Sequence, residues 1–370
     1  MKLDTLAEDV GEWLRGTGPE SDIVMSSRVR LARNVAHYPF VSRMSDQDRG
    51  DVERFLRERI TASPAGSQLE YIDVGRLEEV DRQFLVERQL ISREHAEAQG
   101  ARAVAIDGRE QVSLMINEED HLRMQAICCG LQLGNVFDMI NRVDSELESS
   151  LDFAFDAHLG YLTACPSNVG TGMRASAMLH LPALVMSDQI NKIINSVNKI
   201  GLAVRGLHGE GTEAMGNLFQ VSNQTTLGET EEEIIGRLNR VIEQIIEHEQ
   251  NARALLAQRK PVTLHDQIGR AYGILCHAFS MSSKEALNLL SVIKLGIDLD
   301  VFPEAHRFPV DELFIETQPA HLQKGAQVQK MSSEERDTLR ATIIRAKLNQ
   351  MPGPDMSRLK ISIPPANSKQ

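Results

Sequence analysis

The chain has 370 residues, of which 42% are hydrophobic and 25% are charged, so it can bury a sizeable core and is long enough for two or three domains. Its formal net charge of −12 and isoelectric point near 5.5 argue against non-specific binding to nucleic acid or to an anionic membrane. The sequence contains no signal peptide, no apolar run near the roughly 20 residues that span a bilayer, and no cysteines at metal-ligand spacing. We therefore expect a soluble, cytoplasmic protein.

The N-terminal region is short and polar, and residues 6–14 can form one small helix. A basic stretch, SSRVRLARNV, follows at 26–35. Ser45 and Asp48 then predict a helix start before DVERFLRERI, because a serine at the N-cap and an acidic residue three positions later satisfy each other's backbone groups.

Residues up to about 225 have a strand-rich pattern. Three pairs of apolar segments predict antiparallel strand pairs, at 102–107 with 112–117, within 151–164, and at 201–206 with 217–223. Each pair leads into or encloses an unusual loop, with the sequences NEEDH, CPSNVGTGMR and RGLHGEGTEAMG. Residues 175–185, ASAMLHLPALV, resemble a helix.

The C-terminal part is predicted to be helical. Thr230 and Glu233 form a capping box before an amphipathic helix, a Pro-containing linker is expected at 254–262, and three further helices follow. The predicted organisation is an N-terminal stub, a strand-rich domain, a helical domain and a loose tail, over residues 1–22, 23–254, 261–355 and 356–370.

The predicted strand-end loops carry arginines and carboxylates in unusual number. A single arginine beside a glutamate is usually a surface ion pair of little consequence. Several such loops of one type are harder to explain by folding alone, because arginine is suited to bidentate binding of phosphate. A glutamate set against a cationic substrate can orient it and accept a proton from it.

Four blocks, SSRVRLAR, NEEDHLR, CPSNVGTGMRAS and RGLHGEGTEAMGNLFQVSN, resemble the signature blocks of the ATP:guanidino phosphotransferases, the creatine and arginine kinase superfamily. They occur in the family's order and cover about residues 22–254. The short N-terminal stub and the region after residue 260 differ from phosphagen kinases and are similar to the bacterial protein arginine kinases. The resemblance implies an α+β fold, with an antiparallel sheet flanked by helices and then an all-helical regulatory domain.

The resemblance also implies site residues. Glu119 and Glu210 would hold and deprotonate the guanidinium, with the Cys165 thiolate beside it, while Glu118 and Asp120 would support them or the fold. The residues implied in ATP binding are Ser26, Ser27, Arg28, Val29, Arg30, Arg123, Arg174, Ala175, Ser176, Ala177, Met178, Arg205, Gly206, Leu207, His208, Gly209, Glu210 and, at a spacing that differs by about one residue, His95. Mg²⁺ would be held mainly by the nucleotide, and no protein metal ligand is expected.

Some positions depart from the phosphagen kinase pattern. Gln220 stands where those enzymes carry an aspartate, His208 replaces an arginine, and QTTLG at 224–228 replaces a basic stretch. These departures affect the contacts with ATP and Mg²⁺ that the resemblance implies.

A second motif lies near the C-terminus. Arg336, Asp337, Arg340 and Ala341 form an R-D-x-x-R-A sequence, which by itself is typical of a charged helix face exposed to solvent. In protein arginine kinases this motif forms an allosteric pocket for phosphoarginine.

The resemblance predicts ATP-dependent phosphorylation of arginine side chains in proteins, with a role in marking proteins for degradation or in controlling the stress response. Protein substrates, an activator protein, a Clp-type protease or chaperone system and a homodimer are the implied partners. Two alternatives are a kinase for free arginine or another small guanidine, and a phosphoarginine-binding adaptor with a silent kinase fold.

Overall fold

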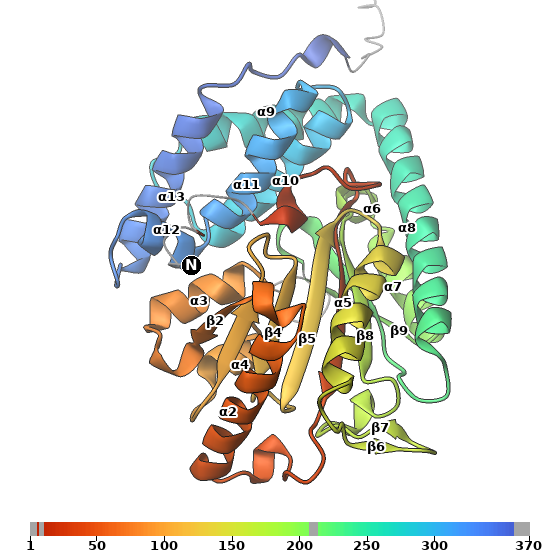
Figure 1. Cartoon of the computed structure of the whole chain (residues 1–370). Helices are drawn as coiled ribbons and strands as arrows, with labels where there is room; N and C mark the ends of the chain where they lie inside the picture. The colour runs from red at the N-terminus through yellow and green to blue at the C-terminus, as the bar shows by residue number, and fades with distance from the viewer. Residues whose placement is uncertain (1–5, 7–10, 207–213, 359–370) are drawn as a thin grey trace, which may run out of the picture.

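The computed structural model describes residues 6, 11–206 and 214–358, and its centre is one eight-stranded sheet (Figure 1). Every neighbouring pair of strands in it is antiparallel, in the order β2-β3-β4-β5-β1-β8-β10-β9. The strands are β1 (Val24–Arg33), β2 (Glu70–Asp73), β3 (Ala103–Ile106), β4 (Val112–Ile116), β5 (Leu122–Cys129), β8 (Met173–His180), β9 (Leu202–Gly206) and β10 (Leu218–Asn223). A separate small hairpin joins β6 (Phe155–Asp156) to β7 (Gly160–Tyr161).

The three predicted strand pairs are confirmed, and the helix predicted over 175–185 is wrong in its first half. Residues 175–180 belong to β8, and only Pro182–Met186 forms a helix, α6. Nearly the whole of β8 is buried, so its apolar residues do not alternate with polar ones, and the sequence pattern cannot separate such a strand from a buried helix. Proline at the first position of α6 marks the true helix start.

One face of the sheet carries the main hydrophobic core. Helices pack against this face through residues such as Leu56, Ile140 and Ile242, which meet Val29 and Ala175 of the central strands. These helices are α2 (Asp46–Ala62), α5 (Leu133–Glu148), α6, α7 (Ile190–Lys199) and α8 (Glu231–Arg259). The capping boxes predicted at the starts of α2 and α8 are both present.

The opposite face of the sheet is covered only in part. Over β2, β3 and β4 it is covered by α3 (Glu79–Glu87) and α4 (Arg93–Glu97). At one end of the central strands, Met25, Ile127 and Met178 join a second hydrophobic cluster with the C-terminal helices. Between these two covers the strands carry polar side chains on this face.

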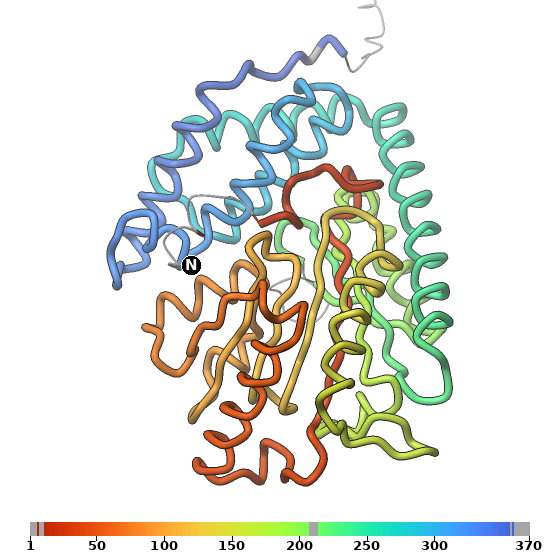
Figure 2. The backbone as a smooth tube through the Cα atoms, in the orientation of Figure 1, coloured from red at the N-terminus to blue at the C-terminus, as the bar shows by residue number. Residues whose placement is uncertain are grey.

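The C-terminal helices form a layer above one end of the sheet (Figure 2). They are α9 (Pro261–His277), α10 (Ser283–Asp298), α11 (Arg307–Glu316), α12 (Pro319–Gly325) and α13 (Ser333–Leu348). The linker expected at 254–262 is almost entirely helical, because α8 continues to Arg259 and α9 begins at Pro261. The break is confined to Lys260, since proline is tolerated in the first turn of a helix.

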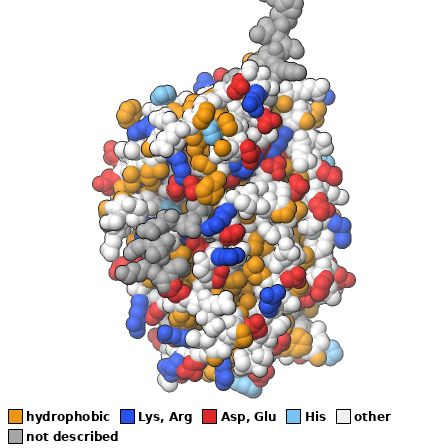
Figure 3. All heavy atoms as spheres, turned by 45° about the horizontal axis from the view of Figure 1, so that its top comes forward, with side chains coloured by type: hydrophobic (Ala, Val, Ile, Leu, Met, Phe, Trp, Pro, Cys, Tyr) orange, Lys and Arg blue, Asp and Glu red, His pale blue; other side chains and the backbone are white. Residues whose placement is uncertain are grey.

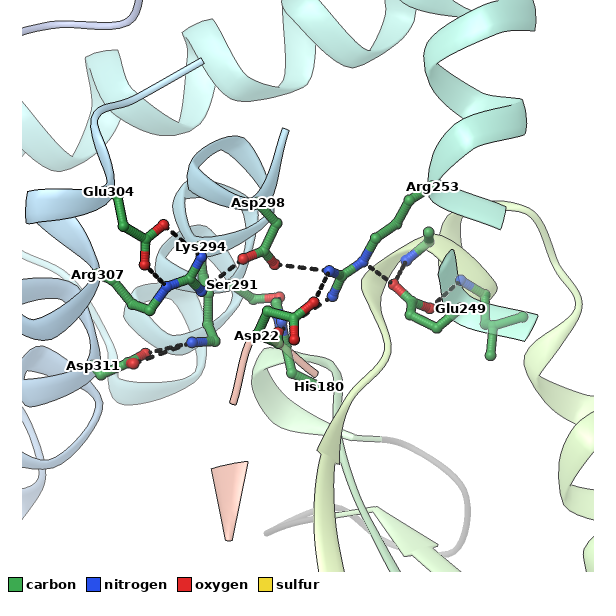
Figure 4. Close-up of polar contacts among 12 residues, drawn as sticks. Asp22, His180, Glu249, Arg253, Ser291, Lys294, Asp298, Glu304, Arg307 and Asp311 are labelled. Atoms are coloured by element: carbon green, nitrogen blue, oxygen red, sulfur yellow. Dashed lines mark hydrogen bonds and ion pairs between the residues drawn. The ribbon is translucent and has the colours of Figure 1, made fainter. Parts of the chain in front are cut away.

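A buried polar network joins α8 and the C-terminal helices to the sheet (Figure 4). Arg253 of α8 lies 2.9 Å from Glu249 and 3.1 Å from Asp298 of α10. Close by, Lys294 donates to Asp311 at 2.8 Å, and both side chains are almost completely buried. His180, at the end of β8, forms a 2.7 Å hydrogen bond with Ser291 of α10. These contacts fix α10 relative to the central strands.

Figure 3 shows the face of the molecule that is seen when the top of Figure 1 is turned forward. Basic, acidic and apolar side chains are interspersed on this face. No helix within residues 11–206 and 214–358 is both long enough and apolar enough to cross a membrane.

Candidate active site

The arginines implicated by sequence gather on the partly covered face of the sheet. All five lie on strands and not in the irregular loops where we expected them: Arg28 and Arg30 on β1, Arg123 on β5, Arg174 on β8 and Arg205 on β9. The register places Arg30 directly opposite Arg174. Arg205 pairs with Gln220 of β10, which is on the same face. Since alternate residues of a strand share a face, the strand pairing alone assembles this cationic surface.

The site is a cleft of about 520 Å³. It lies between the segment around α4 and the arginine-bearing face of the sheet. The strands that contribute side chains to it are β5, β1, β8, β10 and β9. Its lining consists of Arg30, Ser92, Glu94, Glu118, Glu119, Arg123, Arg174, Arg205, Gln220 and Ser222.

Burial, and after it mutual repulsion, lowers the pKa values of several arginines at this cleft. Burial, followed by the charges of Arg123 and Arg174, lowers the pKa of Arg28 to about 10. Burial and the neighbouring arginines also lower the pKa values of Arg30 and Arg174. Within residues 11–206 and 214–358, the Nε atoms of these two arginines are buried and have no hydrogen-bond partner. Guanidinium groups that gather in this way, with few carboxylates among the described residues, form a site for a multiply charged anion.

Arg123 differs from the other arginines because it has a carboxylate partner. Its Nη1 donates to both oxygens of Glu118 at 2.7 Å, and Glu118 also accepts from the Ser92 hydroxyl at 2.7 Å. Burial alone would raise the pKa of Glu118, but Arg123 and these hydrogen bonds outweigh it and lower the pKa. Glu118 therefore remains ionised and fixes the direction of Arg123.

Glu119 and Cys165 form the second part of the site. Glu119 is exposed at the cleft, and the Cys165 side chain lies close enough to its carboxylate to affect its pKa. Burial against the protein, together with the charges of Asp120 and Glu118, raises the pKa of Glu119. The Cys165 sulfur also lies 3.0 Å from the Ser167 hydroxyl. A carboxylate and a thiol are thus adjacent at one end of the arginine face.

Asp120 and His121 hold the loops that carry these groups. Asp120 is buried and accepts from the Asn34 side chain at 2.6 Å and from the backbone N–H of Ala164, next to Cys165, at 2.7 Å. His121 is buried and bonded to backbone groups of the segment 35–39. Both residues connect the NEEDH loop to neighbouring backbone and do not line the cleft.

Several predicted ATP-binding residues do not face the cleft. The side chains of Val29, Ala175 and Ala177 belong to the main core on the other side of the sheet. Met178 packs in the cluster beneath the C-terminal helices.

Among the predicted serines, Ser26 and Ser176 are buried, and Ser27 is bonded to the carbonyl of Gly130. Like the core-facing residues, these serines belong to strands that carry the arginines.

His95 also lies away from the cleft. It is fully buried, with Nε2 3.1 Å from the carbonyl oxygen of Ala103. Burial lowers the pKa of His95 to about 4, so it is neutral near pH 7. The structure places it in the packing of α4.

The last block predicted from sequence is described only in part. Gly206 ends β9, beside Arg205, whereas Leu207, His208, Gly209 and Glu210 lie outside the described residues. The described base of this segment is fixed by Gly216, whose N–H donates to Asn288 of α10 at 2.8 Å.

Ser92, Glu94 and Ser222 also line the cleft, although they were not predicted from the sequence. Ser92 caps α4 and binds Glu118, and Ser222 accepts from Arg174 at 3.2 Å. Two features of the sequence could have indicated them. Ser222 is two residues from Gln220 on a predicted strand and so shares its face, and Ser92 stands at a helix-capping position. Among the described residues there is no group of three or more His, Cys, Asp or Glu side chains arranged to hold a metal ion.

The C-terminal motif lies beside a different cleft. Arg336 lines a cavity of about 600 Å³ between α3 and the helices α10, α12 and α13. Arg340 is buried and donates to the carbonyls of Thr317 and Met281 and to Asp337. Ala341 is part of the second hydrophobic cluster.

Comparison with known families agrees with this geometry. A family model described as the C-terminal catalytic domain of ATP:guanido phosphotransferases matches residues 51–252, and one described as the C-terminal domain of the protein-arginine kinase McsB matches residues 261–359. A protein-arginine kinase of Halothermothrix orenii is 45% identical over 346 residues, which cover 94% of this chain and 99% of the relative. The chain belongs to the protein-arginine kinase family.

Other relatives give the same result. A protein-arginine kinase of Symbiobacterium thermophilum is 46% identical over 91% of this chain and 96% of its own length. One of Brevibacillus brevis is 45% identical over 91% of this chain and 94% of its own length. As a member of this family the chain is an enzyme, a phosphotransferase that acts on guanidino groups, and family membership implies the use of ATP.

Solved structures share the fold. A lombricine kinase superposes with a TM-score of 0.56 at 23% identity, over 67% of this chain and 71% of its own. A duplicated taurocyamine kinase from Schistosoma mansoni gives a TM-score of 0.54 at 24% identity, over 66% of this chain and 34% of its own. The expected phosphagen-kinase-like fold, an antiparallel sheet flanked by helices and followed by a helical region, is confirmed.

Proposed function

We propose that this chain transfers the γ-phosphoryl group of ATP to the guanidino group of arginine side chains in proteins. The observation that carries the proposal is the juxtaposition of two groups of opposite charge in one cleft. A row of arginines whose charges repel one another offers sites for phosphate oxygens, and Glu119 at its end offers a carboxylate for a guanidinium.

The chemistry assigned to Glu119 follows from the acceptor. A guanidinium has a pKa above about 12, so its nitrogen is a poor nucleophile until a proton leaves. The Glu119 carboxylate would bind one N–H, align that nitrogen with the γ-phosphorus and accept its proton as the N–P bond forms and the bond to ADP breaks. The raised pKa of Glu119 makes it a better base than an ordinary glutamate. Glu210, outside the described residues, is proposed as the second carboxylate of this clamp.

The arginines are assigned to the nucleotide phosphates. Phosphoryl transfer is accelerated mainly by positioning and by stabilising charge on the equatorial oxygens, which is what fixed guanidinium groups supply. Mg²⁺ is proposed to arrive with ATP and to neutralise part of the phosphate charge, since it needs few protein carboxylates. Cys165, beside Glu119, would contribute to the electrostatics around the guanidinium.

The proposal is tested by incubating the protein with Mg·ATP and either an unstructured arginine-rich protein or free arginine. We expect acid-labile phosphate on the protein and little on the free amino acid, because a phosphoramidate hydrolyses in acid where a phosphoserine does not. Glu119→Gln keeps the side-chain shape and should abolish transfer while leaving ATP binding intact. The exposed Glu97→Gln, on the same helix α4 but not in the cleft lining, is the matched control. Acid-stable product, or turnover by Glu119→Gln near the wild-type rate, would contradict the proposal.

We propose a second, regulatory site for phosphoarginine at the C-terminal motif. Arg336 borders the 600 Å³ cleft and would meet the phosphate, while Asp337, which accepts a hydrogen bond from Arg340 in this structure, would turn to the guanidinium. Arg340 already joins three segments through its hydrogen bonds, so a ligand that competes for it would alter their packing. Binding can activate the enzyme only to the extent that it favours an active conformation.

Arg336→Ala is the informative variant for this second site, because Arg336 is half-buried and its loss leaves no buried carboxylate unpaired. Stimulation by added phosphoarginine should disappear, whereas ATP affinity should not change. Calorimetric titration of phosphoarginine against wild type and variant measures this directly. Equal binding by both proteins would assign the motif to packing alone.

The cellular role is a further proposal, based on the resemblance of the sequence to the bacterial protein arginine kinases. Phosphorylation of arginines would mark proteins for a Clp-type protease or control stress-response regulators, with an activator protein and a homodimer as partners. Comparison of arginine phosphorylation in cells with and without the gene, before and after heat stress, tests this role.

A further inference from the structure

We infer that Gln89 is a positioning residue for Arg28 and sets the geometry of the nucleotide-binding arginines. The inference builds on the proposed function, in which Arg28 belongs to the phosphate-binding group. Gln89 lies just after α3, in the segment that passes over the arginine face. Its side-chain oxygen accepts from Arg28 Nη1 at 2.9 Å.

The backbone at Gln89 provides the first independent observation. α3 ends in a Schellman motif, since the N–H of Leu90 donates to the carbonyl of Leu85 and the N–H of Gln89 to that of Val86. Gln89 occupies the left-handed position of this motif, with φ of +63°. Glycine is the favoured residue there, because a side chain with a Cβ is disfavoured in this conformation. A glutamine at this position indicates that its side chain has a use that offsets the backbone strain.

The second observation is that Gln89 contacts the arginine face twice. Its backbone carbonyl accepts from the side chain of Gln125 at 2.5 Å. Gln125 pairs with Arg30 across β1 and β5. Gln89 therefore bridges β1 and β5 at the level of the arginines, by its side chain to one strand and its backbone to the other.

The third observation concerns charge. Arg28 lies close enough to Arg123 and Arg174 for their charges to lower its pKa, so it would move away from them if nothing held it. A carboxylate at position 89 would hold Arg28 and also neutralise it, as Glu118 does to Arg123. The amide of Gln89 holds Arg28 without neutralising it, which leaves the positive charge available for a phosphate oxygen.

The position of Gln89 is fixed from the side of the helical layer. Two residues earlier, Glu87 accepts from the backbone N–H groups of Ala320 and His321 of α12 at 2.8 and 3.0 Å. The same carboxylate lies 2.7 Å from the His321 ring. The end of α3 thus contacts α12 on one side and Arg28 on the other.

Three variants test the inference. Gln89→Glu keeps the shape and adds the neutralising charge, Gln89→Gly removes the side chain and suits the backbone, and the exposed Gln99→Glu adds the same charge ten residues away as a control. We expect Gln89→Glu to raise the Kd for Mg·ATP about tenfold or more, because one phosphate contact loses its charge assistance. Gln89→Gly should raise the Kd severalfold at unchanged or higher thermal stability, and Gln99→Glu should match wild type.

The kinetic readout separates positioning from a general defect. KM for ATP should rise with the Kd, while KM for the protein acceptor should change little. An ATP affinity of both Gln89 variants within twofold of Gln99→Glu would overturn the inference. If Gln89→Glu fails to fold, Gln89→Gly decides the matter, since glycine is favoured at this φ. If wild type binds ATP but phosphorylates no protein, the proposed function fails, and the comparison of ATP affinities still tests the role of Gln89.

Discussion

Replacing Glu118 by glutamine should destabilise the fold because it breaks the ion pair that anchors Arg123. The Glu118 side chain is 1% exposed and accepts four short contacts, two from Arg123 and one each from Ser92 and the N–H of Glu119. Removing one partner of a buried ion pair costs about 3–5 kcal/mol. Arg123 is 19% exposed and glutamine keeps one acceptor oxygen, so we expect the loss to be about 2–3 kcal/mol.

Urea unfolding at pH 7 measures this loss, with an expected fall in the midpoint of about 1 M for a denaturant slope of 2–3 kcal/mol per molar. The folded-state pKa of Glu118 is depressed, so its contribution is present above the unfolded value of 4.5 and is lost as pH falls through the lower folded value. The difference in free energy of unfolding between wild type and Glu118→Gln should therefore become smaller below pH 4.5. Glu94→Gln, an exposed neighbour, should change the free energy of unfolding by less than about 0.5 kcal/mol. Equal stability of wild type and Glu118→Gln at pH 7, or a difference in stability that stays constant in acid, would refute the reasoning.

Three further outcomes are expected. Cys165→Ser should lower kcat about tenfold or more with little change in KM for ATP, because the thiol lies beside Glu119, where the guanidinium would bind; steady-state kinetics decide this, and an unchanged kcat would assign Cys165 to packing. Turnover should fall in acid with an apparent pKa above the usual 4.5 of a glutamate, because Glu119 acts as a base only when ionised and its pKa is raised; a kcat profile that stays flat down to pH 4.5 would contradict this. Lys294→Met should cost about 3–5 kcal/mol in urea unfolding, because it leaves the Asp311 carboxylate buried without its ammonium partner; stability equal to wild type would show that Asp311 takes up a proton at little cost.

Local rules predicted the features that depend on a few neighbouring residues. The capping boxes predicted at Ser45 and Thr230 are present, because each depends on a hydroxyl and a carboxylate three residues apart. The 103–116 hairpin also follows from alternation around a short turn. β8 was missed over 175–180 because a strand buried on both faces shows no alternation.

The site residues were predictable as types but not in their arrangement. We expected the arginines in loops, whereas they project from strands, and their common face is set by the register of β1 with β5 and β8. Gln89 carries no sequence signal, since its contact with Arg28 joins residues 61 positions apart. Only the folded sheet brings such groups together.

The second hydrophobic cluster has a consequence for how the molecule loses its structure. Trp13 and Leu14 near the N-terminus, Met178 and Leu218 of the sheet, and helices of the C-terminal layer all bury apolar surface in it. The sheet domain and the C-terminal helices cannot separate without exposing that surface to water. The free-energy cost of this exposure is about 25 cal/mol for each Å² of apolar surface. The two parts should therefore melt together in a single calorimetric transition, and cutting the chain at Lys260 should leave fragments that stay associated until both unfold.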